Sequence, residues 1–342
     1  MTGPPLTPAT PRHVLVTGGA GFIGSHLTDL LLARDDRVTV VDDLSTGRRD
    51  NLPPIHPGLS FVRDDLARFL AGPGRDTRFD QIYHLAAAVG VKLVMDQPVR
   101  SIEVNVEQTA ALLRFACTAG PDGRPAPVLI ASSSEVYGKS AHSPFAEDDD
   151  VLYGPTTKGR WSYAASKAID EYLALAHHAQ HALPAVIVRF FNTVGPRQVG
   201  TYGMVLPTFV AAALRNADIP VHGDGTQSRC FCDVRDAVTA LPPLLERPAC
   251  AGRVFNLGSD RVITILDLAH EVINVLGSSS RVMLVPYDRA YAAGFEDLAQ
   301  RKPDLTRIRA AIGFQPRRSL RDTILDLAAD LRSRPPAPAQ TS

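Results

Sequence analysis

The sequence feature that most restricts the fold is a glycine cluster between an apolar run and an amphipathic one. Residues 13–17 predict a short strand, and residues 22–32 have the apolar spacing of a helix. Gly18, Gly21 and Gly24 follow the strand at three-residue intervals. The first glycine allows a tight turn, the second lets backbone N–H groups approach a pyrophosphate, and the third lets helix and strand pack closely. The cluster therefore predicts a dinucleotide site at a helix N-terminus.

An acidic residue after the next strand indicates which dinucleotide binds. Residues 37–41 predict that strand, and Asp42 follows it at the distance at which a carboxylate accepts hydrogen bonds from the adenosine ribose. Its charge would repel a 2′-phosphate, so we expect NAD rather than NADP, although Arg48 and Arg49 lie nearby in the sequence. The other expected cofactor contacts near these strands are Phe22, Ile23, Asp65 and Leu66.

Apolar runs alternate with amphipathic segments up to about residue 190. Further strands are predicted at 60–63, 81–86, 127–132 and 185–190, and helices at 101–118 and 163–180. This alternation predicts an α/β fold with a Rossmann-type, doubly wound parallel sheet. We expect an NAD-binding domain over 13–190, a smaller substrate-binding lobe over 191–330 from which some segments return to the sheet, and flexible tails at 1–12 and 333–342.

Composition excludes several classes of partner. The 36 basic and 36 acidic side chains cancel, so no global field would draw the chain onto nucleic acid or a membrane. The four cysteines contain a single C-x-C pair, which is too few for a structural zinc site, and we expect no metal and reduced thiols. Without a long apolar stretch or a secretory signal pattern, the sequence predicts a cytoplasmic protein.

Two residues one helical turn apart indicate acid–base chemistry. Tyr163 and Lys167 are four positions apart in a predicted helix, so their side chains share a face. An ammonium near a phenol favours the phenolate, and we expect Lys167 to lower the pKa of Tyr163. In an arbitrary helix the same spacing would only mean a half-buried tyrosine beside a solvated lysine. The context favours a base for a sugar hydroxyl.

A serine run follows the strand at 127–132. Ser133 can donate or accept a hydrogen bond at a reacting hydroxyl, although such a run is also typical of a plain turn. Together with Thr17-Gly-x-x-Gly-x-x-Gly24 and Tyr163-x-x-x-Lys167, the run resembles the extended short-chain dehydrogenase/reductases over about residues 13–330. The resemblance implies a catalytic trio of Ser133, Tyr163 and Lys167. It also implies that Lys167 holds the nicotinamide ribose and that Asn105 lies near the cofactor.

The resemblance extends to enzymes that act on nucleotide sugars. A sugar diphosphate needs several fixed donors, for which guanidinium groups are well suited. The matching positions are Asn192, Arg229 and Arg301, with Ser133 and Ser134 at the sugar. Either arginine alone would more often be a solvated surface charge. The implied partner is a small nucleotide sugar, with UDP as the expected nucleotide.

The reaction type depends on the residues near C5 and C6 of the sugar. Glu135 in Ser134-Glu-Val-Tyr resembles UDP-glucuronate decarboxylases, whereas 4,6-dehydratases carry an aspartate in place of Ser134, so we rank dehydration low. Met204 stands where the decarboxylases have an arginine and resembles the 4-epimerases. We place 4-epimerisation of a UDP-hexose or UDP-hexuronate first, with Glu135 as a further catalytic residue, and decarboxylation second.

Two other classes stay open. A non-catalytic NAD-binding regulator would keep the fold without the chemistry, and a simple alcohol dehydrogenase would release NADH into solution. Resemblance to the family further implies a homodimer, formed through two helices of each subunit, one of which carries Tyr163 and Lys167.

Overall fold

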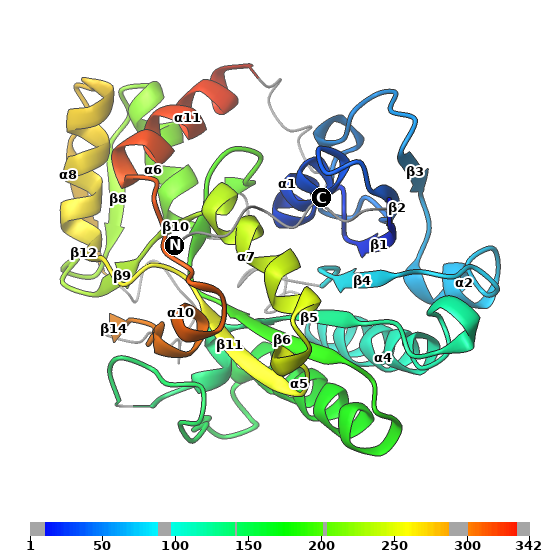
Figure 1. The fold of residues 1–342 in the computed structure, drawn as a ribbon. Helices are drawn as coiled ribbons and strands as arrows, with labels where there is room; N and C mark the ends of the chain where they lie inside the picture. Colours follow the sequence, from blue (N-terminus) through cyan, green and yellow to red (C-terminus); the bar gives the residue numbers. More distant parts are fainter. Residues whose placement is uncertain (1–10, 88–96, 141, 201–203, 287–299, 334–342) are drawn as a thin grey trace.

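The computed structural model describes residues 11–87, 97–140, 142–200, 204–286 and 300–333 (Figure 1). Its central sheet has seven parallel strands in the order β11-β6-β5-β4-β1-β2-β3. These strands are β1 (His13–Thr17), β2 (Arg37–Val41), β3 (Leu59–Val62), β4 (Gln81–His84), β5 (Val128–Ser133), β6 (Ala185–Phe190) and β11 (Arg253–Leu257). The predicted doubly wound α/β fold is confirmed.

Helices cover both faces of the sheet. One face packs against α2 (Leu66–Ala71), α4 (Pro98–Ala116) and α5 (Ser162–His181). The other face packs against α1 (Phe22–Leu32), α7 (Val234–Glu246) and α10 (Thr306–Ile312). Both cores consist of aliphatic and aromatic side chains that are almost wholly excluded from water, and their burial supplies the main driving force for folding.

The order of the strands reverses beside β1. The chain proceeds from β1 outward through β2 to β3, and then crosses to β4 on the other side of β1. In open α/β sheets, ligands bind in the crevice at the carboxyl ends of the strands at such a reversal. Gly18 follows β1 and Leu85 follows β4, so the predicted dinucleotide turn lies at this point.

The smaller lobe has a core of its own, formed mainly by three helices and one strand. These are α6 (Val205–Leu214), α8 (Ile265–Leu276), α11 (Leu320–Ser333) and β8 (Ile219–His222), which lie together at the left of Figure 1. The remaining strands are β7 (Thr193–Val194), β9 (Ser228–Cys230), β10 (Cys232–Asp233), β12 (Val262–Thr264), β13 (Val282–Val285) and β14 (Gln300–Arg301). The C-terminal segment also returns three elements, α7, β11 and α10, to the layers of the large sheet.

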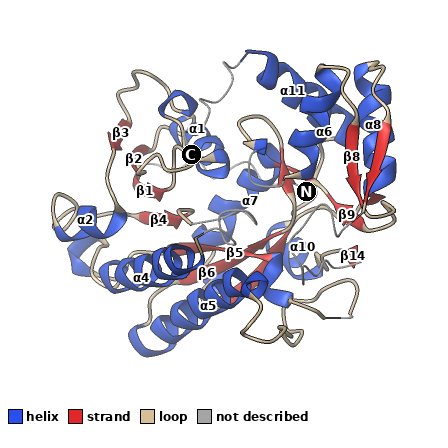
Figure 2. Ribbon diagram, turned by 180° about the vertical axis from the view of Figure 1, so that it is seen from behind, coloured by secondary structure: helices blue, strands red, loops and turns tan. Residues whose placement is uncertain are grey.

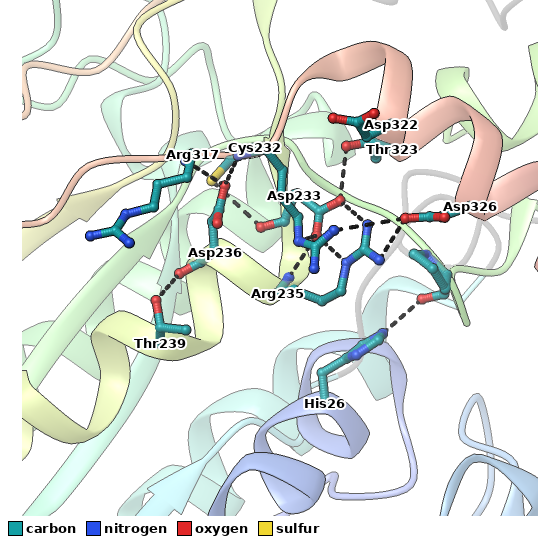
Figure 3. Close-up of polar contacts among 12 residues, drawn as sticks. His26, Cys232, Asp233, Arg235, Asp236, Thr239, Arg317, Asp322, Thr323 and Asp326 are labelled. Carbon is teal, nitrogen blue, oxygen red and sulfur yellow. Dashed lines mark hydrogen bonds and ion pairs between the residues drawn. The ribbon is translucent and has the colours of Figure 1, made fainter. Parts of the chain in front are cut away.

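A buried carboxylate ties the lobe to α7. Asp233 lies at the N-terminus of α7, where it accepts hydrogen bonds from Arg235 and, at 2.8 Å, from the hydroxyl of Thr323 in α11. Arg235 also pairs with Asp326 of α11 at 2.6 Å, and Figure 3 shows Arg235 and Thr323 pointing to Asp233, with Asp326 on the other side of the guanidinium. The view from behind in Figure 2 shows α11 beside α6. Helices far apart in the sequence are thus fixed to one another.

Two residues of the predicted tails are held in place: Ser333, which ends α11 and donates to the carbonyl of Asp330, and Arg12. The guanidinium of Arg12 pairs with Glu246 of α7 at 2.6 Å, and its backbone N–H donates to Asp36. Residues 1–10 and 334–342 of the predicted tails lie outside the described residues. In the described ranges the four cysteines are free thiols, and no helix there is long and apolar enough to cross a bilayer.

Candidate active site

The turn after β1 is built for close approach of a ligand to the backbone. Gly18 has a φ of 68°, and a Cβ added at Gly24 would lie 2.1 Å from the carbonyl oxygen of Gly18. No side chain caps the N-terminus of α1, and its first turn holds no acidic residue. Because the backbone N–H groups and partial positive charge of this helix end face the turn, the site fits the pyrophosphate of a dinucleotide.

Asp42 lies at the end of β2, as expected of a ribose-binding carboxylate. Its two oxygens accept hydrogen bonds from the backbone N–H groups of Ala20 at 2.9 Å and Leu44 at 2.8 Å. Burial raises the pKa of Asp42, and these N–H groups oppose the shift. Each oxygen keeps a second lone pair with which it can accept a ribose hydroxyl. The carboxylate thus favours NAD over a 2′-phosphorylated cofactor.

The two arginines that left NADP open are engaged elsewhere. Arg49 donates to the backbone carbonyls of Leu52 and Pro53 and lies over the ring of Phe61. Arg48 pairs with Asp50 at 3.7 Å. Neither guanidinium is therefore held ready for a 2′-phosphate.

Asp65 and Leu66 follow β3, but their side chains have structural partners. Asp65 caps α2 by accepting hydrogen bonds from the N–H groups of Ala67 and Arg68, and its other oxygen accepts one from Gln108 at 2.7 Å. The side chain of Leu66 is buried in the core. A ligand at this edge could reach Leu66 only through its backbone.

Ser133 and Tyr163 lie together at the carboxyl end of β5. The hydroxyl of Ser133 accepts a hydrogen bond from the N–H of Glu135 at 3.2 Å, and it lies close enough to the phenol of Tyr163 to act on the pKa of that group. Burial and the charge of Glu135 raise the pKa of Tyr163, and Ser133 opposes the shift. The structure therefore brings the predicted serine and tyrosine close together.

Lys167 does not act on Tyr163 as we expected from the spacing. Its ammonium donates to Asp170 at 2.6 Å, and both side chains are buried. The net lowering of the pKa of Tyr163 that we expected is wrong, because burial, followed by the charges of Glu135 and Asp170, raises that pKa. Asp170, three residues along the helix, also offsets the charge of the ammonium. Asn105 of α4 lies close by and donates to Ser166 at 3.2 Å.

Glu135 lies between two guanidinium groups. It forms an ion pair with Arg160 at 2.7 Å and another with Arg301. Burial alone would raise the pKa of Glu135, but Arg301 and Arg160 outweigh it and lower the pKa to about 2. The three groups carry a net charge of +1, so this cluster can attract one more anionic group.

The other predicted substrate residues lie near this cluster on strands β9 and β14 and on the segment beside β9. Arg229 of β9 is paired in register with Arg301 of β14, and both are buried. Asn192 donates to the carbonyl of Cys230 in β9 at 3.2 Å. Ser134 is buried.

Sequence reasoning missed the role of Arg160. The segment 158–163 before Tyr163 resembles UDP-glucuronate decarboxylases, and this resemblance was the available signal, but it did not single out Arg160. The structure places Arg160 in a short 3-10 helix, η4 (Gly159–Trp161), where it is buried against Glu135.

Comparisons with known proteins agree with this geometry. Residues 14–258 match the model of the NAD dependent epimerase/dehydratase family. A UDP-N-acetyl-alpha-D-glucosaminuronate decarboxylase of Bacillus cytotoxicus is 39% identical over 306 residues, which cover 89% of this chain and 93% of that protein. UDP-glucuronic acid decarboxylase 1 of Arabidopsis thaliana is 34% identical, over 94% of this chain and 70% of that protein. The solved structure of UDP-glucuronic acid 4-epimerase from Bacillus cereus, in complex with UDP-glucuronic acid and NAD, is 26% identical with a TM-score of 0.79, covering 94% of this chain and 99% of that chain.

The fold and the site therefore define the class of this protein: it is a Rossmann-type enzyme that modifies nucleotide sugars with NAD. It belongs to the NAD dependent epimerase/dehydratase family. The predicted family, cofactor and class of substrate are confirmed. Between the two reactions that the sequence left open, the relatives favour decarboxylation over the 4-epimerisation that we placed first.

Proposed function

We propose that this protein decarboxylates a UDP-linked hexuronate. The observation that carries the proposal is the cluster of Glu135, Arg160 and Arg301 beside Ser133 and Tyr163. A sugar whose C6 is a carboxylate needs a positive group near its reacting alcohol, and the net charge of +1 supplies it. Met204, before the first residue of α6, stands where the decarboxylases have an arginine. The loss of that arginine does not exclude a sugar carboxylate, because Arg160 and Arg301 can bind it.

Each side chain has a proposed role. Tyr163 takes the proton of the C4 hydroxyl as the general base, and Ser133 holds that oxygen. When bound, NAD supplies the chemistry of accepting and returning the hydride of C4. A sugar with a C4 ketone and a C6 carboxylate is a β-keto acid, so its C5–C6 bond can break with loss of CO₂ while the electron pair moves toward the C4 oxygen. The resulting enolate then takes a proton from water at C5, which restores the C4 ketone. Arg160 and Arg301 orient the carboxylate for the loss of CO₂.

The role of Glu135 follows from its charge. With its pKa at about 2, Glu135 is ionised at neutral pH and is a poor proton donor. We propose that it positions the two guanidinium groups and does not protonate the sugar.

Arg229 and Asn192 are the proposed contacts of the diphosphate. The pairing of β9 with β14 sets Arg229 beside Arg301, so that the diphosphate and the sugar carboxylate would bind at adjacent guanidinium groups. A planar guanidinium donates two parallel hydrogen bonds to either group. This arrangement supports a substrate with an anionic sugar as well as an anionic diphosphate.

The deciding experiment compares sugars with and without a carboxylate. The purified enzyme is incubated separately with UDP-N-acetylglucosaminuronate, UDP-glucuronate, UDP-glucose and UDP-N-acetylglucosamine, and the mass and stereochemistry of each product are determined. We expect CO₂ loss from one or both uronates and no change in the neutral sugars. Tyr163→Phe should abolish turnover while NAD stays bound.

Epimerisation of a UDP-uronate is the second candidate, because the solved structure from Bacillus cereus binds UDP-glucuronic acid and Met204 replaces an arginine. A product of unchanged mass with inverted C4 would establish it and overturn decarboxylation. Loss of water would overturn both.

We further propose a cytoplasmic homodimer. The outer sides of α4 and α5, which lie side by side in Figure 1, expose apolar residues to solvent. These are Val99, Ile102, Ile169 and Tyr172. Contiguous exposed apolar surface of this kind is typical of an interface between subunits.

A further inference from the structure

The ion pair between Lys167 and Asp170 has no evident structural purpose. The side chain of Lys167 is 2% exposed and that of Asp170 is wholly buried, with 2.6 Å between Nζ and Oδ2. Burying two charges costs desolvation free energy that their attraction often does not recover, so such a pair is weak support for stability. The pair lies one helical turn from Tyr163. The position of this ion pair therefore points to a role in the reaction rather than in stability.

The pair continues into a line of buried polar side chains. His84 of β4 contacts the hydroxyl of Thr17 through Nδ1 at 2.7 Å and that of Thr109 through Nε2 at 3.1 Å. Burial and the charge of Lys167 lower the pKa of His84 to about 3, so the ring is neutral. The oxygen of Thr17 also accepts a hydrogen bond from the N–H of Ala86 at 3.2 Å. Both ring nitrogens of His84 therefore have hydroxyl partners, and the neutral ring donates to one of them and accepts from the other.

Thr109 lies near this carboxylate without a hydrogen bond to it. Burial raises the pKa of Asp170, and Lys167, followed by Thr109, lowers it. Oδ1 of Asp170 makes no hydrogen bond to the described residues. Asp170 is therefore held by Lys167, through Oδ2.

We propose that Asp170 is a positioning residue, which fixes the ammonium of Lys167 and offsets part of its charge at Tyr163. The proposal concerns the step at the C4 hydroxyl, which decarboxylation and epimerisation share. It therefore does not depend on which of the two reactions the enzyme performs. This role cannot be recognised from the sequence, because an aspartate three residues after a lysine is an ordinary helical surface pair.

The other charged groups around Lys167 and Tyr163 have partners of their own. Glu135 raises the pKa of Tyr163 but is held by two arginines. Glu171, the next residue on α5, makes a bidentate pair with Arg189. Of the acidic side chains in the described ranges, Asp170 is the one that forms an ion pair with Lys167. A change at Asp170 should hence act on the ammonium and on the phenol.

Both effects of removing this charge have the same sign. In Asp170→Asn the amide can still accept a hydrogen bond from Lys167, but the negative charge is lost. The phenol then ionises at lower pH, because the nearby positive charge is no longer offset. The ammonium, now buried without a counter-ion, loses its proton at lower pH as well. The acidic and alkaline limbs of the activity profile should both move to lower pH.

The test is the pH profile of kcat and kcat/KM on whichever substrate the enzyme turns over. For Asp170→Asn we expect both limbs to move down by about one pH unit or more, as is usual when a contacting charge is removed. KM should stay within about two-fold of the wild-type value, since the residue acts through Lys167. Asp170→Glu, which keeps the charge, should restore the profile with a reduced kcat.

A readout that does not need turnover accompanies the profile. The ultraviolet absorbance of tyrosinate, titrated against the Tyr163→Phe variant, reports ionisation of this one phenol, and in Asp170→Asn it should move to lower pH. NAD content after purification should equal that of the wild type. A titration and profile that superimpose on the wild type would overturn the proposal, and so would a loss of activity without a shift in pH.

The matched control is Asp233→Asn, a buried aspartate paired with arginine in the other lobe. Asp233→Asn should lose thermal stability without shifting either limb of the activity profile. An equal pH shift in this control would mean that the shift in Asp170→Asn comes from general destabilisation, which would overturn the proposal. If Asp170→Asn does not fold, Asp170→Ser is measured in its place, because it also removes the charge and leaves room for water beside the ammonium. The same downward shift would support the proposal, and a wild-type profile would contradict it.

Discussion

Glu135 offers a test at the scale of a single residue. Its pKa in the folded protein is about 2, below its ordinary value, because Arg301 and Arg160 outweigh the effect of burial. Because the pKa is lower in the folded protein than in the unfolded chain, the ionised carboxylate stabilises the fold at any pH above the ordinary pKa of 4.5. This stabilisation is lost as the pH falls toward 2. Its size is on the order of 3 kcal/mol.

We therefore expect Glu135→Gln to be less stable than the wild type by a constant amount between about pH 5 and pH 8, and the difference to shrink below about pH 4. Urea denaturation at several pH values, followed by the fluorescence of Trp161, measures this difference. A gap that widens on acidification would mean that the carboxylate is not held by the two arginines.

Residue types and spacing predicted part of this site. Ser133, Tyr163 and Glu135 were recognisable from their local motifs, and the structure brings them together. The partners of Glu135 were not recognisable, because Arg301 is 166 positions away and Arg160 has the pattern of a surface residue. The neutralisation of Lys167 by Asp170 was equally hidden, since it depends on both side chains being buried, which the sequence does not state.

At the scale of secondary structure, the glycine turn and α1 form the element on which NAD binding depends. A Cβ at position 24 would lie 2.1 Å from the carbonyl oxygen of Gly18, and backbone atoms cannot move aside as a flexible side chain can. We expect Gly24→Ala to displace the start of α1 from β1, to abolish co-purification of NAD and to lower stability by a few kcal/mol. NAD content and thermal denaturation measure both effects.

Gly159→Ala is the matched control, because a Cβ there meets nothing within 4 Å. It should retain NAD and stability. If Gly24→Ala bound NAD normally, the close approach of helix and strand would not be the reason for this glycine.

The elements themselves were largely predictable, for a physical reason. Strands buried on both faces leave a continuous apolar run, and helices that cover a sheet leave an apolar stripe, so β1, β2 and α5 could be read from periodicity. The return of β11 to the edge of the sheet could be anticipated only in general, because strand order is set by packing between distant segments. Asp65 was likewise predicted only as a cofactor contact, whereas its carboxylate caps α2 by accepting hydrogen bonds from the backbone N–H groups at the start of that helix.

At the scale of the whole molecule, the apolar face of α4 and α5 is the feature that the single chain leaves uncovered. Tyr172 is 69% exposed and Ile169 is 44% exposed on neighbouring positions of α5, with Val99 and Ile102 on α4. Across a two-fold axis, the same face of a second copy would cover these side chains, as closed symmetric dimers do. Each large apolar side chain withdrawn from water contributes about 1.5–3 kcal/mol, so this face can hold two subunits together.

We accordingly expect the wild type to sediment as a dimer at micromolar concentration and Ile169→Asp combined with Tyr172→Asp to sediment as a monomer, because burying two carboxylates per subunit without partners is strongly unfavourable. Analytical ultracentrifugation measures the state of both. Leu325→Asp, at an exposed leucine of α11 in the other lobe, is the control and should remain dimeric. Ile169 and Tyr172 lie on the same helix, α5, as Tyr163 and Lys167. We therefore expect kcat to fall in the monomeric variant, with a smaller change in its affinity for NAD. A monomeric wild type, or a dimer that survives both substitutions, would place the interface elsewhere.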